Sequence, residues 1–291
     1  MKPNIVITMG DPAGIGPEIV SKCFATRRIQ EMCNIIVLET TSKSAGKRLT
    51  SSGRTVLAAI RKGVQLCMSG EADALVTAPV SKKACSKIDR SFVGHTEMLA
   101  EISGARMPVM MMQARACKIV MMTRHTALKD IGRNISVQSL CSVVETTYKD
   151  LIKTYHMQIH NAVMSALNPH AGESGNIGQE EKRIIIPALL FLRKKGYAIT
   201  GPEPADVCMR KLLNGDYDLG FGMYHDQVMI PLKLKYPWET VNVTLGLPFI
   251  RTSPAHGVAY DIAGKNCANP RSMEEAIRVA VEMVKLKKAW R

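Results

Sequence analysis

The chain has 291 residues, of which 46% are hydrophobic and 22% charged, which is typical of a globular protein and excludes a disordered or fibrous one. Its apolar stretches are all shorter than the ~20 residues of a membrane-spanning helix, and the N-terminus lacks a signal-peptide pattern, so we expect a cytoplasmic protein without a membrane partner. The net charge of +14 suggests a nucleic-acid binder, but the basic residues are dispersed and aromatic residues for base stacking are few, so we expect no nucleic acid. The eight cysteines include no CxxC pair, and we expect them to be reduced thiols.

Short apolar runs alternate with amphipathic stretches along the chain, which predicts a largely parallel β-sheet covered by helices. The apolar runs predict strands over residues 4–9, 74–77, 108–113, 118–123, 161–167 and 219–223. Helical spacing predicts helices from residue 18 onward and over residues 54–69, 137–154, 180–195, 205–213 and 272–288. The polar run Thr40–Arg54 predicts an exposed loop.

Two glycine-rich loops each precede a predicted helix, and their glycines are Gly10, Gly14 and Gly16 in the first and Gly172, Gly175 and Gly178 in the second. Backbone N–H groups at such a helix start can bind an anion, but a tight turn without a ligand explains the glycines equally well. Neither loop is a GxxxxGK[ST] or a GxGxxG sequence, so both nucleotide-binding fingerprints are absent.

Three histidines, His125, His170 and His225, directly follow strongly apolar strand segments. Ligands of open α/β sheets bind beyond the carboxyl ends of the strands. Three neutral imidazoles from separate loops would suit Zn²⁺ or a similar divalent ion, with one position left for a substrate, and Asp226 could join such a site or orient a neighbouring group. Structural histidines are the alternative, and the spacing alone does not decide between them.

Two cations, Lys233 and Arg251, lie in otherwise apolar sequence around Asn242. Burial of a cation is costly unless the cation is paired. These side chains would therefore suit a phosphate or carboxylate ligand, with an internal salt bridge as the alternative.

Six segments together resemble the 4-hydroxythreonine-4-phosphate dehydrogenase family of pyridoxal phosphate biosynthesis, which includes threonate and erythronate 4-phosphate dehydrogenase relatives. They are residues 7–18 (ITMGDPAGIGPE), 76–82 (VTAPVSK), 94–97 (GHTE), 168–173 (NPHAGE), 224–227 (YHDQ) and 241–252 (VNVTLGLPFIRT). The match covers nearly the whole chain in the order of the family.

The resemblance implies one family domain over residues 1–291, with an α/β/α sandwich fold similar to isocitrate and isopropylmalate dehydrogenases. Two subdomains would surround a cleft, the first with residues 1–92 and 236–291 and the second with residues 93–235. The family resemblance also implies a homodimer with its active site between the subunits.

The same resemblance implies an NAD- or NADP-dependent enzyme that oxidises and then decarboxylates a 4-phosphorylated hydroxy acid. 4-Hydroxythreonine 4-phosphate is expected ahead of threonate or erythronate 4-phosphate, with a divalent ion (Zn, Mg or Co) on His125, His170 and His225. The implied substrate contacts are His95, Thr96, Lys233, Asn242 and Arg251, and the implied catalytic or orienting residues are Lys233, Asp206 and Asp226.

This chain departs from the family pattern before Arg54, where it is shorter than expected, and at Ala255–Ala259, where an acid and a hydroxyl are replaced. A non-catalytic relative that binds a phosphorylated ligand but has lost dinucleotide binding is therefore the alternative. The sequence does not distinguish NAD from NADP, and it does not identify the residues that bind the cofactor.

Overall fold

The computed structural model describes residues 1–40 and 53–289. Most of the predicted loop Thr40–Arg54 lies outside these residues. Contacts divide the chain into two compact units, unit 1 with residues 1–108 and 241–291, and unit 2 with residues 109–240. Residues 93–108, expected in the central segment, lie in unit 1, and residues 236–240 lie in unit 2.

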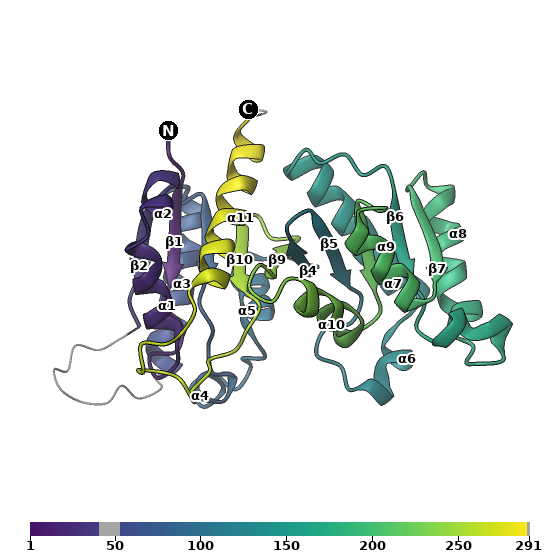
Figure 1. Cartoon of the computed structure of the whole chain (residues 1–291), viewed down its shortest axis with the longest axis horizontal. Coiled ribbons are helices and arrows are strands. Elements are labelled where there is room, and N and C mark those ends of the chain that lie inside the picture. Colours follow the sequence, from purple (N-terminus) through teal and green to yellow (C-terminus); the bar gives the residue numbers. More distant parts are fainter. Residues whose placement is uncertain (41–52, 290–291) are drawn as a thin grey trace. The chain divides into compact units, whose positions relative to one another are not determined.

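Unit 1 contains a five-strand sheet in the order β2-β1-β3-β10-β9 (Figure 1). The bounds are β1 Asn4–Thr8, β2 Asn34–Leu38, β3 Ala74–Thr77, β9 Val241–Leu245 and β10 Ile250–Pro254. All pairs are parallel except β9 with β10. Strand β1, which lies between β2 and β3, is a continuous apolar run with no exposed surface at Ile5, Val6 and Ile7, which is typical of a parallel strand covered on both faces.

Helices cover both faces of this sheet. Their bounds are α1 Gly16–Phe24, α2 Arg27–Met32, α3 Gly53–Ser69, α4 Lys82–Ser86, α5 His95–Ser103 and α11 Arg271–Lys288. The apolar sides of α3 and α5 pack in one cluster with Val6 and Leu75, which are paired neighbours on the same face. The opposite face carries α11, where Thr252 Oγ1 donates a hydrogen bond of 2.7 Å to the carbonyl of Ala276.

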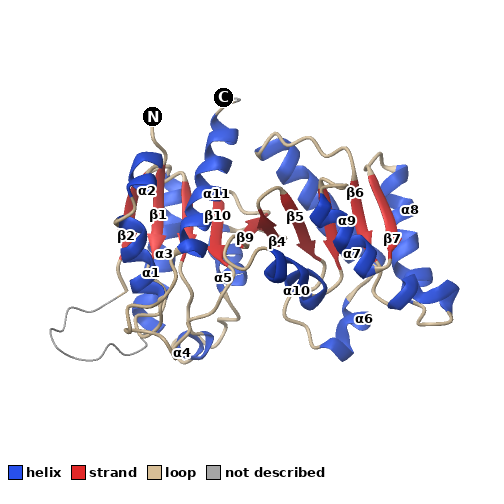
Figure 2. Cartoon of the chain, viewed as in Figure 1, coloured by secondary structure: helices blue, strands red, loops and turns tan. Residues whose placement is uncertain are grey.

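Unit 2 contains strands in the order β4-β5-β8-β6-β7 (Figure 2). The bounds are β4 Val109–Ala114, β5 Cys117–Met121, β6 Ala162–Ser165, β7 Ile199–Glu203 and β8 Leu219–Gly222. Strands β4 and β5 form an antiparallel hairpin, whereas β5, β8, β6 and β7 run parallel. The carboxyl ends of β5, β8 and β6 therefore lie at one edge of the sheet.

The helices of unit 2 are α6 Ile131–Asn134, α7 Val137–Lys149, α8 Ile186–Lys194, α9 Ala205–Asn214 and α10 His225–Lys235. Helix α7 begins with a capping box in which Ser136 and Ser139 satisfy each other's backbone N–H groups, which fixes its start. It continues as a π-helix over Asp150–Thr154, and a second π-helical turn over Glu181–Ile185 precedes α8.

The predicted α/β architecture is confirmed, and each predicted strand and helix is present with small differences at its ends. The predictions missed β2, α2, α4, α5, β7 and α10, and left β9 and β10 unassigned. Within the described residues, no helix is long and apolar enough to span a bilayer.

Candidate active site

The three histidines predicted as metal ligands follow neighbouring parallel strands of unit 2. His125 follows β5, His225 is the first residue of α10 after β8, and His170 lies in a 3₁₀ segment, Pro169–Gly175, after β6. All three side chains are exposed. Because β5, β8 and β6 are adjacent and parallel, the three loops start at the same edge of the sheet, as the strand-end rule predicts.

The side chains themselves do not form a metal cluster within one protomer. In residues 1–40 and 53–289, no group of three or more His, Cys, Asp or Glu side chains is arranged to hold an ion. The donor set of three imidazoles fits a divalent transition metal chemically. Among the described residues, the fold therefore brings the three loops to one edge of the sheet without gathering the three side chains.

Asp226 lies directly against His225. The Nδ1 atom of His225 is 2.7 Å from Oδ1 of Asp226, and both side chains are about half-exposed or more. When the ring carries its proton on Nδ1, this N–H donates a hydrogen bond to the carboxylate of Asp226. The lone pair of Nε2 then remains available to bind a metal ion. Asp226 is therefore placed to orient His225, which was one of its two predicted roles.

In unit 1, Arg251 is buried at 2% exposure on β10. Its Nη1 donates to Thr244 Oγ1 at 2.9 Å, and its Nη2 donates to Thr77 Oγ1 at 2.7 Å. The strand register explains both bonds, because Arg251 pairs directly with Thr244 on β9 and lies on the same sheet face as Thr77 on β3. Burial lowers the pKa of Arg251 to about 10, and the charge of Glu97 opposes this shift, so the guanidinium stays charged at neutral pH.

His95 and Thr96 form the first turn of α5, next to the charge of Arg251. Burial lowers the pKa of His95 well below its usual 6.5, and the positive charges of Arg251 and Lys82 lower it further. The imidazole is therefore neutral at pH 7. Thr96 is only 4% exposed, and the first turn of a helix carries a partial positive charge that favours an anion.

Three predicted substrate residues carry buried polar atoms without a hydrogen-bond partner. These atoms are Nε2 of His95, Oδ1 of Asn242 and Nε of Arg251. Asn242 lies on the same face of β9 as Thr244, and Thr244 pairs directly with Arg251 on β10. A buried polar atom left unpaired costs about 1–3 kcal/mol, so these three atoms are candidates for contact with a ligand.

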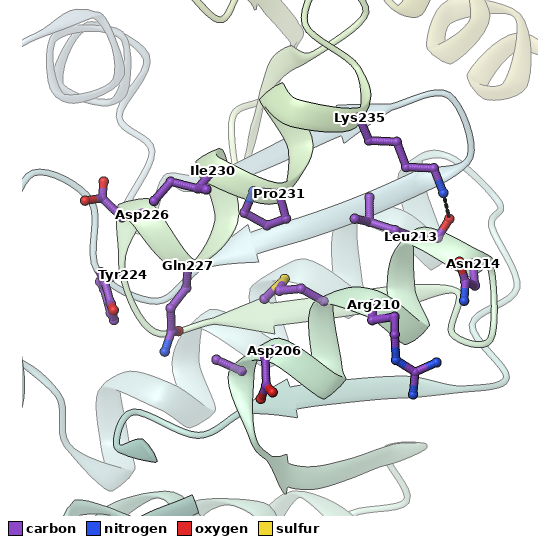
Figure 3. Close-up of a pocket in the computed structure, with 12 residues that line it drawn as sticks. Asp206, Arg210, Leu213, Asn214, Tyr224, Asp226, Gln227, Ile230, Pro231 and Lys235 are labelled. Carbon is purple, nitrogen blue, oxygen red and sulfur yellow. Dashed lines mark hydrogen bonds between the residues drawn. The ribbon is translucent and has the colours of Figure 1, made fainter. Parts of the chain in front are cut away.

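Lys233 and Asp206 are exposed in unit 2. Asp206 and Asp226 line one groove of about 550 Å³, and Figure 3 shows that its walls come from α9 and α10. Lys233 lies on α10 but does not line this groove. Across the groove, Lys235 Nζ donates to the carbonyl of Leu213 at 2.7 Å and ties the end of α10 to α9 (Figure 3).

A second cavity, in unit 1, has a volume of about 530 Å³ and is lined by basic residues. Its charged residues, among those the structure describes, are Arg54, Lys83 and Lys87. Tyr260 also lines it, and its hydroxyl donates to Asp11 Oδ2 at 2.6 Å. No local pattern predicts this cavity, because its residues come from three separate segments of the chain. Its chemistry suits an anionic group.

The first glycine-rich loop is a tight turn rather than an anion cradle. The N–H groups of Asp11 and Ile15 donate to the carbonyls of Pro79 and Val258, and those of Ala13 and Gly14 donate to Asp11 itself. Gly10 has a φ of +73°, and a Cβ at this position would collide with the carbonyl of Pro79. The glycines thus serve close backbone packing within unit 1.

A mainly parallel sheet covered by helices, with polar residues at strand ends, defines an α/β protein of the isocitrate dehydrogenase fold. The isocitrate dehydrogenase from Methylococcus capsulatus shares this fold, with a TM-score of 0.51 and 13% identity over 99% of this chain and 87% of that one. Residues 14–280 match the family described as pyridoxal phosphate biosynthetic protein PdxA, and the chain belongs to that family. The resemblance in the sequence is thereby confirmed.

Named relatives match at nearly full length. The chain is 37% identical over 329 residues to a 4-hydroxythreonine-4-phosphate dehydrogenase from Geobacter metallireducens, covering 98% of this chain and 97% of the relative. The crystal structure of the enzyme of that name from Klebsiella pneumoniae superposes with a TM-score of 0.84 at 31% identity, covering 98% of both chains. The 329-residue alignment exceeds the 291 residues of this chain, so the Geobacter relative has residues without a counterpart here.

Proposed function

We propose that the chain is a metal-dependent NAD(P) dehydrogenase that oxidises and then decarboxylates 4-hydroxythreonine 4-phosphate. The observation that carries this proposal is that buried polar atoms of His95, Asn242 and Arg251 have no hydrogen-bond partner, while His95 feels the charge of Arg251 and Asn242 lies on the strand paired with it. These are the residues that the family resemblance assigns to the substrate. A 4-phosphorylated hydroxy acid offers phosphate and carboxylate oxygens to satisfy the two potential donors, and hydroxyl or amine hydrogens for the Asn242 oxygen.

In this proposal Arg251 holds an anionic group of the substrate. The guanidinium is already fixed by Thr77 and Thr244, so little side-chain entropy is lost when the ligand binds. His95 and Thr96 bind the phosphate from the first turn of α5, where the neutral imidazole donates one N–H and the helix dipole supports the negative charge.

His125, His170 and His225 would hold the divalent ion, Zn, Mg or Co. Such an ion supplies Lewis-acid chemistry that makes a bound alcohol more acidic. Since one protomer does not gather the three exposed rings, we propose that the set is completed between the subunits of a homodimer. Asp226 keeps the ring of His225 oriented for this role.

The proton of the substrate hydroxyl needs an acceptor among the residues of this chain. Lys233 and Asp206 are the candidates, with an ordered water as the third. Asp206 lines the same groove as Asp226, which is the neighbour of His225 in the chain. A bound nicotinamide cofactor would supply the hydride acceptor, and we propose that its phosphates bind in the basic cavity at Lys83 and Lys87.

Support for a second copy comes from exposed apolar side chains on α10, the helix that begins with His225. Ile230 is 56% exposed and Leu234 81% exposed. Such side chains four residues apart form an apolar strip on one side of a helix. Multi-angle light scattering of the purified chain should give the mass of a dimer, and a monomer at assay concentration would contradict this part of the proposal.

We also propose that the enzyme acts in the cytoplasm. All eight cysteines are free thiols in the structure, as expected in a reducing compartment. Burial raises the pKa of Cys23 to about 12, which makes this thiol inert.

The test is NAD(P)H formation with 4-hydroxythreonine 4-phosphate, compared with threonate and erythronate 4-phosphate, in the presence of Zn²⁺, Mg²⁺ or Co²⁺. We expect turnover with the first substrate to be fastest. Absence of turnover with all three by metal-loaded protein would overturn the proposal. Substrate binding without NAD(P) binding in calorimetry would instead indicate the non-catalytic relative.

A further inference from the structure

Glu181 is a buried carboxylate that holds the chain just before His170. It is 2% exposed and lies at the start of the π-helical turn before α8. Its Oε1 accepts hydrogen bonds from the backbone N–H groups of Leu167 at 2.9 Å and Asn168 at 2.8 Å. Its Oε2 accepts a third, from Nδ2 of Asn168 at 2.9 Å. Hydrogen bonds to an ionised carboxylate are about twice as strong as neutral ones.

The segment that follows has an unfavourable backbone conformation. Five consecutive residues, His170 to Ser174, have φ between 42° and 74°, which is a complete left-handed turn. Left-handed conformation costs roughly 1–2 kcal/mol for each residue with a Cβ, and only Gly172 in this turn is free of that cost. Such a turn persists only when its surroundings fix it.

Glu181 also contacts the turn itself. A Cβ placed on Gly172 would meet Oε2 of Glu181 at 2.6 Å, so the turn is folded directly over the carboxylate. The turn closes with the N–H of Ile177 donating to the carbonyl of Gly172 at 3.1 Å. The carboxylate thus fixes both the start of the turn and its middle.

We propose that Glu181 is a positioning residue for His170. Its buried carboxylate stabilises the left-handed turn that directs the imidazole of His170 towards the divalent ion. The inference rests on the proposed function, in which His170 binds the divalent ion. No local pattern marks Glu181, because its hydrogen bonds depend on the tertiary position of residues 167–168. In this role Glu181 acts through the backbone and does not touch the ion.

Glu181→Gln is the informative variant. The amide keeps the volume of the side chain but has one acceptor oxygen. If that oxygen still accepts from the backbone N–H groups of Leu167 and Asn168, the amide NH₂ faces Nδ2 of Asn168. Two donors then oppose each other and the third hydrogen bond is lost. If the amide is turned the other way, both backbone N–H groups lose their acceptor. The matched control is Glu173→Gln, which changes an exposed carboxylate within the same turn.

Two readouts separate positioning from simple stability. The first is the dissociation constant for Co²⁺ by calorimetry, together with the visible absorption spectrum of the bound ion, which reports its ligands. Loss of an orienting group around a metal ligand typically weakens affinity 10- to 100-fold, and we expect this range for Glu181→Gln with an altered spectrum. The second is hydrogen exchange, which should accelerate at the amides of Leu167 and Asn168. Glu173→Gln should match the wild type in both.

The outcomes are distinguishable. Unchanged Co²⁺ affinity and spectrum in Glu181→Gln, with metal binding intact in the wild type, would overturn the inference alone. A wild type that binds no divalent ion would overturn both the inference and the metal-dependent function. Should Glu181→Gln not fold, it is replaced by Asn168→Ala, which removes the side-chain donor to Glu181 and Glu180 and keeps the backbone N–H that donates to Glu181. We expect weakened Co²⁺ binding there too, and an unchanged dissociation constant would contradict the inference.

Discussion

Arg251 and Thr77 are joined by a buried hydrogen bond of 2.7 Å although they are 174 residues apart in the chain. Together with Thr244, Thr77 fixes the guanidinium through hydroxyl oxygens, which satisfy donors but carry no charge to neutralise the cation. The Nε of Arg251 keeps no hydrogen-bond partner. The arrangement is costly for folding and useful for an anionic ligand, which is a pattern of functional residues.

Arg251→Met should therefore damage binding more than folding. Loss of a hydrogen-bonded charge on the substrate costs about 1.5–3 kcal/mol, so KM should rise about 10- to 100-fold. Replacing a buried charge by an apolar side chain of similar volume is often neutral or stabilising, so the melting temperature should not fall. Steady-state kinetics and thermal unfolding check both, with the exposed Arg27→Met as the control. A lower melting temperature with an unchanged KM would show that Arg251 is structural.

The lowered pKa of His95 predicts a pH dependence of stability. In the unfolded chain this imidazole titrates near its usual pKa of 6.5, whereas the folded protein binds the proton only at lower pH. The unfolded state therefore holds more protons below pH 6.5, and the free energy of unfolding falls as the pH is lowered from 7 towards the folded pKa.

His95→Gln should make this loss of stability smaller. Urea unfolding at several pH values from neutral into the acid range measures the slope for the wild type, for His95→Gln and for the exposed control His160→Gln. We expect a shallower slope only for His95→Gln. Equal slopes for all three proteins would exclude His95 as the source of the pH dependence.

Asp226→Asn should weaken metal binding through His225. The amide removes the charge that holds the Nδ1 proton, and an orienting partner of this kind typically contributes 10- to 100-fold in affinity. Calorimetric titration with Zn²⁺ measures the change, and Asp216→Asn, an exposed carboxylate in the loop before β8, is the control. Wild-type affinity in Asp226→Asn would mean that the contact with His225 has no role in metal binding.

Lys83→Ala and Lys87→Ala test the basic cavity as the place of the cofactor phosphates. Each charge-assisted contact is worth about 1.5–3 kcal/mol at most, and exposure reduces this value, so KM for NAD(P) should rise about 10-fold or less. KM for the phosphorylated substrate should not change. The exposed Lys62→Ala on α3 is the control. Equal KM values for the cofactor in all variants would place the dinucleotide elsewhere.

The sequence predicted those parts of the fold that depend on local pattern. The continuous apolar run of β1 and the helical spacing of α3 are local signals, and both elements are present as expected. The missed strand β7 contains Gly201 and Pro202, which weaken any strand signal, and it is an edge strand where proline is tolerated. Pro231 inside α10 similarly concealed a helix.

The candidate site likewise combines features that local sequence pattern predicts with features that depend on tertiary structure. The placement of His125, His170 and His225 after neighbouring parallel strands was predictable, because the strand-end rule needs only strand assignments. The bonds of Glu181 and the register of Arg251 with Thr244 depend on tertiary pairing that local pattern does not encode. A metal site completed between two copies of the chain, as we propose, would depend on contacts that no local pattern encodes.

The most direct test of the account is the return of NAD(P)H formation when a divalent ion is added back to chelator-treated protein with 4-hydroxythreonine 4-phosphate. We predict that activity disappears on chelation, returns in the wild type, and does not return in His225→Ala. Full activity of the metal-free protein, or full recovery of His225→Ala, would contradict the proposal that three histidines bind a catalytic ion.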